Sequence, residues 1–215
     1  MKMKKFNRCV IISGGPEPLD FKILPDDFII ACDKGHAYAI EKGLIPHLFV
    51  GDGDSYHGII HPPTEHLRLP AEKDDTDTLF AAKHAAKLGF DDFIILCGLG
   101  GRLDHTLANL SVCTWLAKQG KSVCMYGKNE TVFATGSALS IKREEGFSLS
   151  LFAVEKCKGV TLKGVKYPLE NAVLTPDFPL GVSNEFDANI ANLTIKSGIC
   201  LVVLSRLDRY SGGIK

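Results

Sequence analysis

Short apolar runs alternate with segments of helical periodicity through the first half of the chain. Continuous apolar runs that end in glycine or aspartate are typical of buried strands. Such runs predict strands at residues 8–13, 27–32, 48–50, 93–97 and 122–126, with a further short strand at 65–69. Helical spacing closed by glycine predicts helices at 36–42, 77–88 and 104–118.

The spacing of leucine and alanine predicts which side of two helices faces the core. For the helix at 77–88, which Asp75 or Thr76 can cap, the expected apolar stripe is Leu79, Ala82 and Ala86. For the helix at 104–118, the expected stripe is Leu103, Leu107 and Leu110.

Strands that alternate with helices predict a mostly parallel sheet with helices on its faces. Asp33, Asp52, Asp54 and the glycine loop that begins at Gly98 all come directly after predicted strands. Ligands of open α/β sheets bind at the edge formed by the carboxyl ends of the strands. The sequence therefore predicts a site at this edge.

The pattern changes near residues 127–130, after which no helical period continues. Short β-rich runs separated by turn residues follow at 131–135, 139–142, 148–153, 160–162, 172–174, 192–195 and 201–204. This pattern is typical of an antiparallel sandwich or small barrel. We therefore predict an α/β domain at 1–128, with flanking helices, and an antiparallel β domain at 129–215.

Composition excludes several classes of protein. Lys+Arg and Asp+Glu both number 25, so a basic nucleic-acid-binding surface is not expected. The seven cysteines include no CxxC pair and mostly lie in apolar runs, which favours reduced structural thiols and a cytoplasmic setting. The basic N-terminus precedes an apolar run too short for a signal peptide, and no stretch is long enough to span a membrane.

Two aspartates follow the strand at 48–50 in the motif Gly51-Asp52-Gly53-Asp54-Ser55. Asp52 and Asp54 can point to one side, where their charges repel unless a cation is bound. Hard divalent ions such as Mg²⁺ prefer carboxylate oxygens and retain room for phosphates. The alternative is an Asx-turn loop with solvated aspartates.

A second acidic cluster, Asp74-Asp75-Thr76-Asp77, opens the helix at 77–88. Capping and the helix dipole explain one or two of these residues. A further metal ligand together with phosphate contacts would explain why three carboxylates crowd one turn.

A glycine loop, Gly98-Leu99-Gly100-Gly101, leads into Arg102-Leu103-Asp104-His105 at the start of a helix. Backbone N–H groups at a helix start bind phosphate, and arginine can grip phosphate oxygens with two hydrogen bonds. The loop matches neither GxxxxGK[ST] nor GxGxxG, so a plain strand-to-helix turn capped by Asp104 is the alternative. His105 is more simply a helix-terminal or packing residue than a catalytic one, and Asn109, one turn later, is by default an exposed polar residue.

Together these motifs resemble the thiamine pyrophosphokinase family over nearly the whole chain. The matching pieces, in the family's order, are Gly14-Gly15, Ala31-Cys32-Asp33 with Gly35, Gly51 to Ser55, Asp74 to Asp77, and Gly100 to His105 with Asn109. In the β-rich part, Gly164-Val165-Lys166-Tyr167-Pro168-Leu169 and Gly181-Val182-Ser183-Asn184-Glu185 are similar to the family's "GxxWPL" and "SN" segments.

The resemblance implies an α/β domain followed by an antiparallel β-sandwich, usually in a homodimer with the active site near the subunit interface. It implies Mg²⁺-dependent transfer of the diphosphate of ATP to thiamine, with AMP as the second product. By the resemblance, Asp52, Asp54 and Asp77 hold the metal and act in catalysis with Arg102. Asp74 and Asp75 add outer or further metal contacts.

The resemblance also assigns binding roles. Arg102, Gly100 and Gly101 hold the triphosphate, Asp104 and Asn109 orient ATP or its metal, and Gly14, Gly15 and Asp33 line the nucleotide cleft. Ser183 and Asn184 seat thiamine, with Tyr167 as an aromatic wall. Two residues depart from the family pattern, because Lys34 stands where glycine is common and Tyr167 stands where tryptophan is common.

Three points stay open from the sequence. The acceptor could be another primary alcohol such as a pterin, because the acceptor pocket is the least readable part of the chain. The chain could also bind nucleotide or thiamine without catalysis. The general base is not identified, although Asp54 is a candidate.

Overall fold

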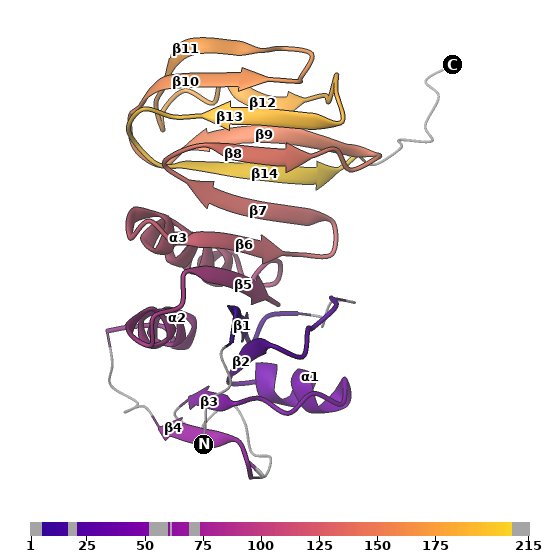
Figure 1. The fold of residues 1–215 in the computed structure, drawn as a ribbon, viewed down its shortest axis with the longest axis vertical. Helices are drawn as coiled ribbons and strands as arrows, with labels where there is room; N and C mark the ends of the chain where they lie inside the picture. Colours follow the sequence, from indigo (N-terminus) through magenta and orange to yellow (C-terminus); the bar gives the residue numbers. More distant parts are fainter. Residues whose placement is uncertain (1–5, 17–20, 52–59, 61, 69–73, 208–215) are drawn as a thin grey trace. The chain divides into compact units, whose positions relative to one another are not determined.

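A computed structural model of the chain describes residues 6–16, 21–51, 60, 62–68 and 74–207. The chain folds as two compact units, Met1–Lys128 and Asn129–Lys215 (Figure 1).

The first unit is an α/β unit. Its elements are β1 (Arg8–Ile12), β2 (Asp27–Cys32), α1 (Gly35–Glu41), β3 (Leu48–Gly51), β4 (Glu65–Arg68), α2 (Asp77–Lys87), β5 (Asp92–Leu96), α3 (Leu103–Lys118) and β6 (Ser122–Tyr126). The strands lie in the order β6-β5-β1-β2-β3-β4, and each neighbouring pair is parallel. The predicted parallel sheet with helices is therefore present.

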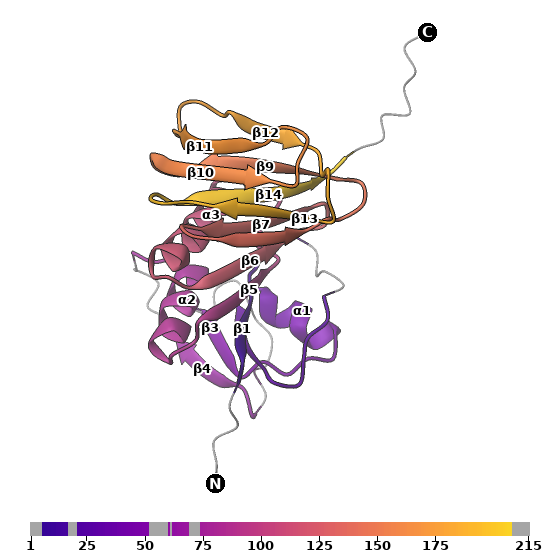
Figure 2. The ribbon, with the colours of Figure 1, turned by 45° about the horizontal axis from the view of Figure 1, so that its top comes forward.

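The order of the strands reverses between β1 and β5. From β1 the chain adds β2, β3 and β4 on one side, and it then returns to place β5 on the other side of β1. The helices α2 and α3 lie on one face of the sheet and α1 lies on the other (Figure 2). In the register of the sheet Ile12 lies beside both Ala31 and Leu96, so the carboxyl ends of β1, β2 and β5 share one edge. Such a switch point is where open α/β sheets bind ligands.

The buried faces of α2 and α3 differ from the predicted stripes. In α2 the buried residues are Thr78, Ala81, Ala82 and Ala85, so only Ala82 of the predicted stripe is fully buried. In α3 the predicted stripe is wrong, because Leu103 and Leu107 are exposed and the buried residues are Asn109, Val112, Cys113 and Leu116. The first turns of α3 therefore carry no core face, and the helix is buried only from Asn109 onward.

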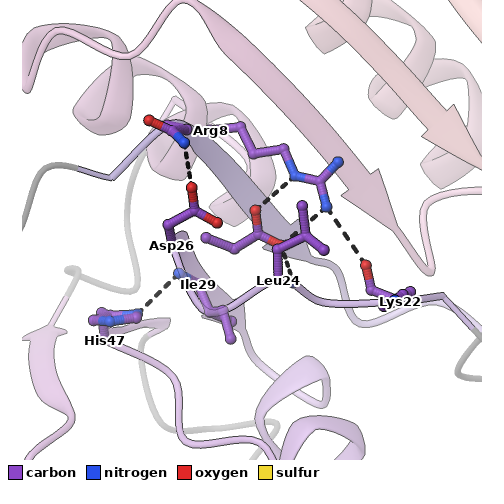
Figure 3. Close-up of polar contacts among 8 residues, drawn as sticks. Arg8, Lys22, Leu24, Asp26, Ile29 and His47 are labelled. Atoms are coloured by element: carbon purple, nitrogen blue, oxygen red, sulfur yellow. Dashed lines mark hydrogen bonds and ion pairs between the residues drawn. The ribbon is translucent and has the colours of Figure 1, made fainter.

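At the amino edge of the sheet, Arg8 of β1 and Asp27 of β2 form an ion pair (Figure 3). The Arg8 guanidinium donates to both carboxylate oxygens of Asp27, at 2.6 and 3.0 Å, and Asp27 also accepts the Leu24 N–H at 2.7 Å. The Asp27 side chain is fully buried. The pair therefore ties the segment before β2 to the start of β1.

We expect Asp27→Asn to lower the free energy of unfolding by about 2 kcal/mol, because a hydrogen bond to a charged group contributes 1.5–3 kcal/mol. Urea denaturation measures the change. Asp91→Asn, at an aspartate whose side chain is 84% exposed, is the matched control and should stay within about 0.5 kcal/mol of wild type. Equal stability of the Asp27 and Asp91 variants would contradict the anchoring role.

The second unit is built from antiparallel strands. They are β7 (Glu130–Thr135), β8 (Leu139–Lys142), β9 (Phe147–Ala153), β10 (Cys157–Lys163), β11 (Leu169–Leu174), β12 (Gly181–Asn184), β13 (Ile190–Thr194) and β14 (Cys200–Arg206). One sheet has the order β11-β10-β13-β8, and β12-β9-β14-β7 are neighbours in the other. Leu149, Leu151 and Val202 of the latter share a single core with Val160, Leu162 and Leu193 of the former. Two antiparallel sheets thus face each other across one hydrophobic core.

The strand β12 was not predicted, because the sequence Gly181-Val182-Ser183-Asn184 lacks the β-branched alternation of a strand. Its pairing with β9 is irregular between Gly181 and Asn184, where Ser183 has a φ of 57°. A short strand interrupted by a left-handed residue has no clear sequence signal.

All seven cysteines lie in the described residues as buried free thiols, as expected from their apolar surroundings. Burial raises the pKa of the Cys113 thiol to about 12, which makes it a poor nucleophile. Among the helices of the described residues, none has both the length and the apolar character that a membrane crossing requires.

Candidate functional site

The loops after β1 and β5 are bonded to each other at the switch point. The Ser13 N–H donates to Leu96 O at 2.9 Å, and the Gly15 N–H donates to Cys97 O at 3.0 Å. The backbones approach so closely that a Cβ on Gly15 would lie 2.3 Å from Cys97 O. The predicted nucleotide-cleft residues Gly14 and Gly15 are therefore at the carboxyl edge of the sheet, against the start of the glycine loop.

Asp33 follows β2 at the same edge. Its N–H donates to Val50 O at 3.2 Å, and its φ of 48° places it in the left-handed region, which aspartate tolerates better than most residues. A Cβ on Gly51 would lie 2.7 Å from the Asp33 carboxylate. The Asp33 carboxylate therefore packs against the residue directly before Asp52. Asp52 and Asp54 themselves lie outside the described residues.

The start of α2 is joined to the end of β1 by two buried hydroxyls. Thr76 caps the helix, as predicted for Asp75 or Thr76, and accepts the Leu79 N–H at 3.2 Å. The Thr78 hydroxyl lies 2.7 Å from the Ser13 hydroxyl. Asp77 is half-buried between these two threonines, at the first position of the helix. The hydroxyl pair thus holds the Asp77 backbone at the edge that carries Gly14 and Asp33.

We expect Thr78→Val to lower the free energy of unfolding by about 1–2 kcal/mol, because it leaves the buried Ser13 hydroxyl without its partner. Thr78→Ser restores the hydroxyl and should recover most of the loss. Urea denaturation of the three proteins makes the comparison, and a Thr78→Val protein as stable as wild type would argue against the bond.

The rest of the acidic cluster has a partly structural explanation. Both carboxylate oxygens of Asp75 accept from Lys83 Nζ, each at 2.8 Å, and Asp74 is exposed. The Asp75–Lys83 ion pair ties the residues before α2 to the second turn of the helix. Asp75 therefore has a helix-stabilising partner in addition to any role toward a nucleotide.

The glycine loop after β5 is held against α3 by side chains of the helix. Asn109 Nδ2 donates to Gly98 O at 2.8 Å, and the Thr106 hydroxyl donates to Gly100 O at 3.1 Å. Gly100 and Gly101 both have positive φ, 80° and 70°, which glycine adopts without strain, and a Cβ on either would lie within 3.3 Å of the Pro16 ring. Asn109 is buried, not exposed, and its amide fixes the loop rather than pointing into solvent.

Arg102 and Asp104 form an exposed ion pair at the start of α3. The Arg102 guanidinium donates to both oxygens of Asp104, at 3.1 and 2.6 Å, and lowers the pKa of that carboxyl. The predicted cap at Asp104 is wrong, because the N-cap position is Arg102 and Asp104 lies inside the first turn, where it accepts the His105 N–H at 2.9 Å. The Arg102 guanidinium thus stands beside the glycine loop and the N-terminus of a 16-residue helix.

The described ranges contain no cluster of three or more His, Cys, Asp or Glu side chains that could hold a metal ion. Two carboxylates of the candidate set, Asp33 and Asp77, are at the carboxyl edge, and β3 ends at Gly51, the residue before Asp52 in the sequence. All the candidate ligands are carboxylate oxygens, which is the donor chemistry that Mg²⁺ prefers.

In the second unit the two predicted acceptor segments are adjacent. The side chain of Asn184 bonds the backbone of Tyr167 in both directions, with the Tyr167 N–H donating to Oδ1 at 3.0 Å and Nδ2 donating to Tyr167 O at 2.8 Å. The Ser183 N–H donates to the Ser150 hydroxyl at 2.9 Å. Tyr167 is 63% exposed.

Sequence reasoning missed the residues that hold the site together: Ser13, Thr78 and Thr106. Ser13 could have been noticed, because a hydroxyl directly after a buried strand falls at the binding edge. Thr78 and Thr106 carry no signal beyond their place near a helix start.

Comparison with known proteins agrees with this geometry. Residues 23–125 match the family model "Thiamin pyrophosphokinase, catalytic domain", and residues 138–200 match "Thiamin pyrophosphokinase, vitamin B1 binding domain". A thiamine pyrophosphokinase of Bacillus subtilis is 30% identical over 94% of this chain and 99% of its own length. Thiamin pyrophosphokinase 1 of Caenorhabditis elegans is 26% identical over 77% of this chain and 72% of its own.

Solved structures are also similar. The crystal structure of thiamine pyrophosphokinase from Bacillus subtilis has a TM-score of 0.81 at 26% identity, covering 93% of this chain and 99% of that one. The enzyme from Geobacillus thermodenitrificans has a TM-score of 0.82 at 25% identity, covering 94% and 98%. The chain therefore belongs to the thiamin pyrophosphokinase family.

Proposed function

We propose that the chain transfers the diphosphate of ATP to the hydroxyethyl oxygen of thiamine at the switch-point edge of its first unit, with Mg²⁺ on the phosphates. The single observation that carries this proposal is the convergence of four segments at that edge. These are the loops after β1, β2 and β5 and the start of α2, which together bring Gly15, Asp33, Asp77 and the glycine loop to one place.

Asp77 would hold the metal together with Asp52 and Asp54. The position of Asp77 at the first residue of α2, fixed by the Ser13–Thr78 bond, supports this role. The Asp33 carboxylate packs against Gly51, so it would help to hold the backbone that leads into Asp52. Bound Mg²⁺ would neutralise charge on the transferred group and orient the phosphates.

The triphosphate would lie over the glycine loop. The backbone of Gly100 and Gly101 leads directly into α3, whose N-terminal N–H groups and dipole favour an anion. Arg102 would exchange its bonds with Asp104 for bonds to phosphate oxygens, which have the same two-pronged geometry. Asp104 holds the guanidinium ready in the free protein, and Asn109 fixes the loop through Gly98.

In the reaction, the thiamine hydroxyl oxygen forms a bond to the β-phosphorus of ATP. The bond between that phosphorus and the oxygen bridging to the α-phosphate breaks, and AMP leaves with this oxygen. The hydroxyl proton passes to solvent or to a carboxylate at the edge. Catalysis then consists chiefly of positioning and charge neutralisation. The carboxylates would hold Mg²⁺, and the metal and Arg102 would oppose the negative charge of the phosphates.

The acceptor would be held by the second unit, whose residues 138–200 match the vitamin B1 binding domain. Tyr167 supplies an exposed ring suited to a cationic heterocycle.

We also propose a homodimer, as the family resemblance implies, which light scattering after size exclusion would test. The seven buried free thiols support a reducing, cytoplasmic setting.

The test is incubation with ATP, Mg²⁺ and thiamine, followed by separation of nucleotides and thiamine esters. AMP and thiamine diphosphate in equal amounts are expected. ADP with thiamine monophosphate would overturn diphosphate transfer, and ligand binding without AMP release would indicate a sensor. A competition between thiamine and a pterin alcohol identifies the acceptor, and preference for the pterin would refute the proposed substrate.

A further inference from the structure

We propose that Asn184 is a positioning residue that sets the exposed ring of Tyr167 for the cationic acceptor and does not itself contact the acceptor. The inference rests on the proposed function, and it changes the role that the sequence predicts for Asn184 from vitamin contact to clamp. Every observation that carries it comes from the second unit alone.

The polar atoms of Asn184 are engaged within the protein. Its Oδ1 accepts both the Tyr167 N–H and the Glu185 N–H, each at 3.0 Å, and its Nδ2 donates to Tyr167 O at 2.8 Å. The residue is only 5% exposed. An amide oxygen has two acceptor sites, so Oδ1 is saturated, and a ligand could bond to it only by displacing these bonds. Nδ2 uses one of its two N–H groups on Tyr167 O, and the burial of the residue restricts access to the other.

The residues directly before Tyr167 are bonded to the residues directly after Asn184. The Lys166 N–H donates to Glu185 O at 2.9 Å, Lys166 and Glu185 form an ion pair at 3.0 Å, and Val165 bridges to Phe186. Gly164 has no room for a side chain, because a Cβ there would lie 2.3 Å from Ile190 O. The backbone is therefore fixed up to Tyr167, and Asn184 makes the last pair of bonds.

The ring that this clamp presents is suited to a cation. Tyr167 is 63% exposed, and the Lys166 ammonium lies 5.7 Å from the centre of its ring. A ring that already takes an ammonium on its face can take a heteroaromatic cation by the same attraction. Since the attraction depends on the placement of the ring, loosening the backbone at Tyr167 should weaken binding as much as removing the ring does.

A double-mutant cycle tests the inference with thiamine as the probe. Asn184→Asp keeps the shape of the side chain but places an acceptor where Tyr167 O requires a donor. We expect Asn184→Asp and Tyr167→Ala each to raise the thiamine Kd, measured by calorimetry, by about 10-fold. The double variant should be no weaker than Tyr167→Ala alone, because both changes remove the same interaction. Because the acceptor is held less firmly, KM for thiamine should rise with little change in kcat.

Losses that multiply to about 100-fold in the double variant would overturn the inference, because Asn184 would then contribute independently of Tyr167. So would an unchanged Kd in Asn184→Asp. Asn192→Asp, the same substitution at an exposed asparagine of the same unit, is the control and should bind thiamine as wild type does. A wild-type protein that does not bind thiamine would refute the proposed function. If the wild-type protein turns over and Asn184→Asp binds thiamine with the wild-type Kd, only the inference is refuted.

Hydrogen exchange on the wild-type protein gives a test that needs no variant. The Tyr167 amide should exchange at least about 10-fold more slowly than an unprotected amide, although its side chain is exposed, because its N–H is bonded to Asn184. Exchange at the unprotected rate would overturn the clamp.

Discussion

Replacing Asp77 with asparagine is expected to lower the rate of thiamine diphosphate formation by ~10²-fold or more. Asparagine keeps the size of the side chain and removes the charge that would bind Mg²⁺. Because Asp77 opens α2 and the Ser13–Thr78 bond holds its backbone, the substitution should leave the edge of the sheet in place. The Mg²⁺ concentration needed for half-maximal rate should rise in the same variant.

The control for this prediction is Asp91→Asn, which makes the same chemical change at an exposed aspartate of the first unit. It should turn over at the wild-type rate. The stability of both variants is measured in parallel, since Asp77 also faces the N-terminal dipole of α2 and its loss should cost about 0.5 kcal/mol. Full activity of Asp77→Asn with wild-type dependence on Mg²⁺ would remove the metal role.

Replacing Gly15 with alanine is expected to lower the free energy of unfolding by about 3 kcal/mol and to abolish most nucleotide binding. The added Cβ would lie 2.3 Å from Cys97 O, which is backbone and has no rotamer to change. The loops after β1 and β5 must therefore separate, and the Gly15–Cys97 hydrogen bond at the switch point must break. Urea denaturation and calorimetric titration with an ATP analogue measure the two effects.

Gly14→Ala is the matched control for stability. At Gly14 a Cβ would have its nearest neighbour, Lys34 N, at 3.6 Å, which is an ordinary contact. It should therefore unfold within about 0.5 kcal/mol of wild type. Gly15→Ala as stable as Gly14→Ala would show that the two loops are not packed as described.

The sequence predicted the edge of the sheet well because the relevant signals are local. Each buried strand reads as an apolar run, and the polar residue after it must lie at the carboxyl edge once the strands are parallel. Asp33 and Gly15 could be placed in this way without knowing which strands are neighbours. The cap at Thr76 is equally local, since it depends on residues within one turn.

The features that the sequence did not predict depend on distant or ambiguous contacts. The bond between Ser13 and Thr78 joins residues 65 positions apart and requires the reversal of strand order that places α2 over β1. The stripe predicted for α3 was wrong because periodicity alone does not determine which side of a helix meets the sheet, and here Leu103 and Leu107 precede the buried part. The clamp between Asn184 and Tyr167 joins two loops whose proximity only the folded unit shows.

The most direct test of the central claim is a crystal structure with Mg²⁺, thiamine and the α,β-methylene analogue of ATP, in which the bond that must break is replaced. An Asp77 oxygen is expected about 2.0–2.1 Å from the Mg²⁺ ion, with Asp52 or Asp54 on the same ion. A Mg²⁺–triphosphate bound elsewhere, or bound at this edge with Asp77 turned away from the ion, would contradict the central claim.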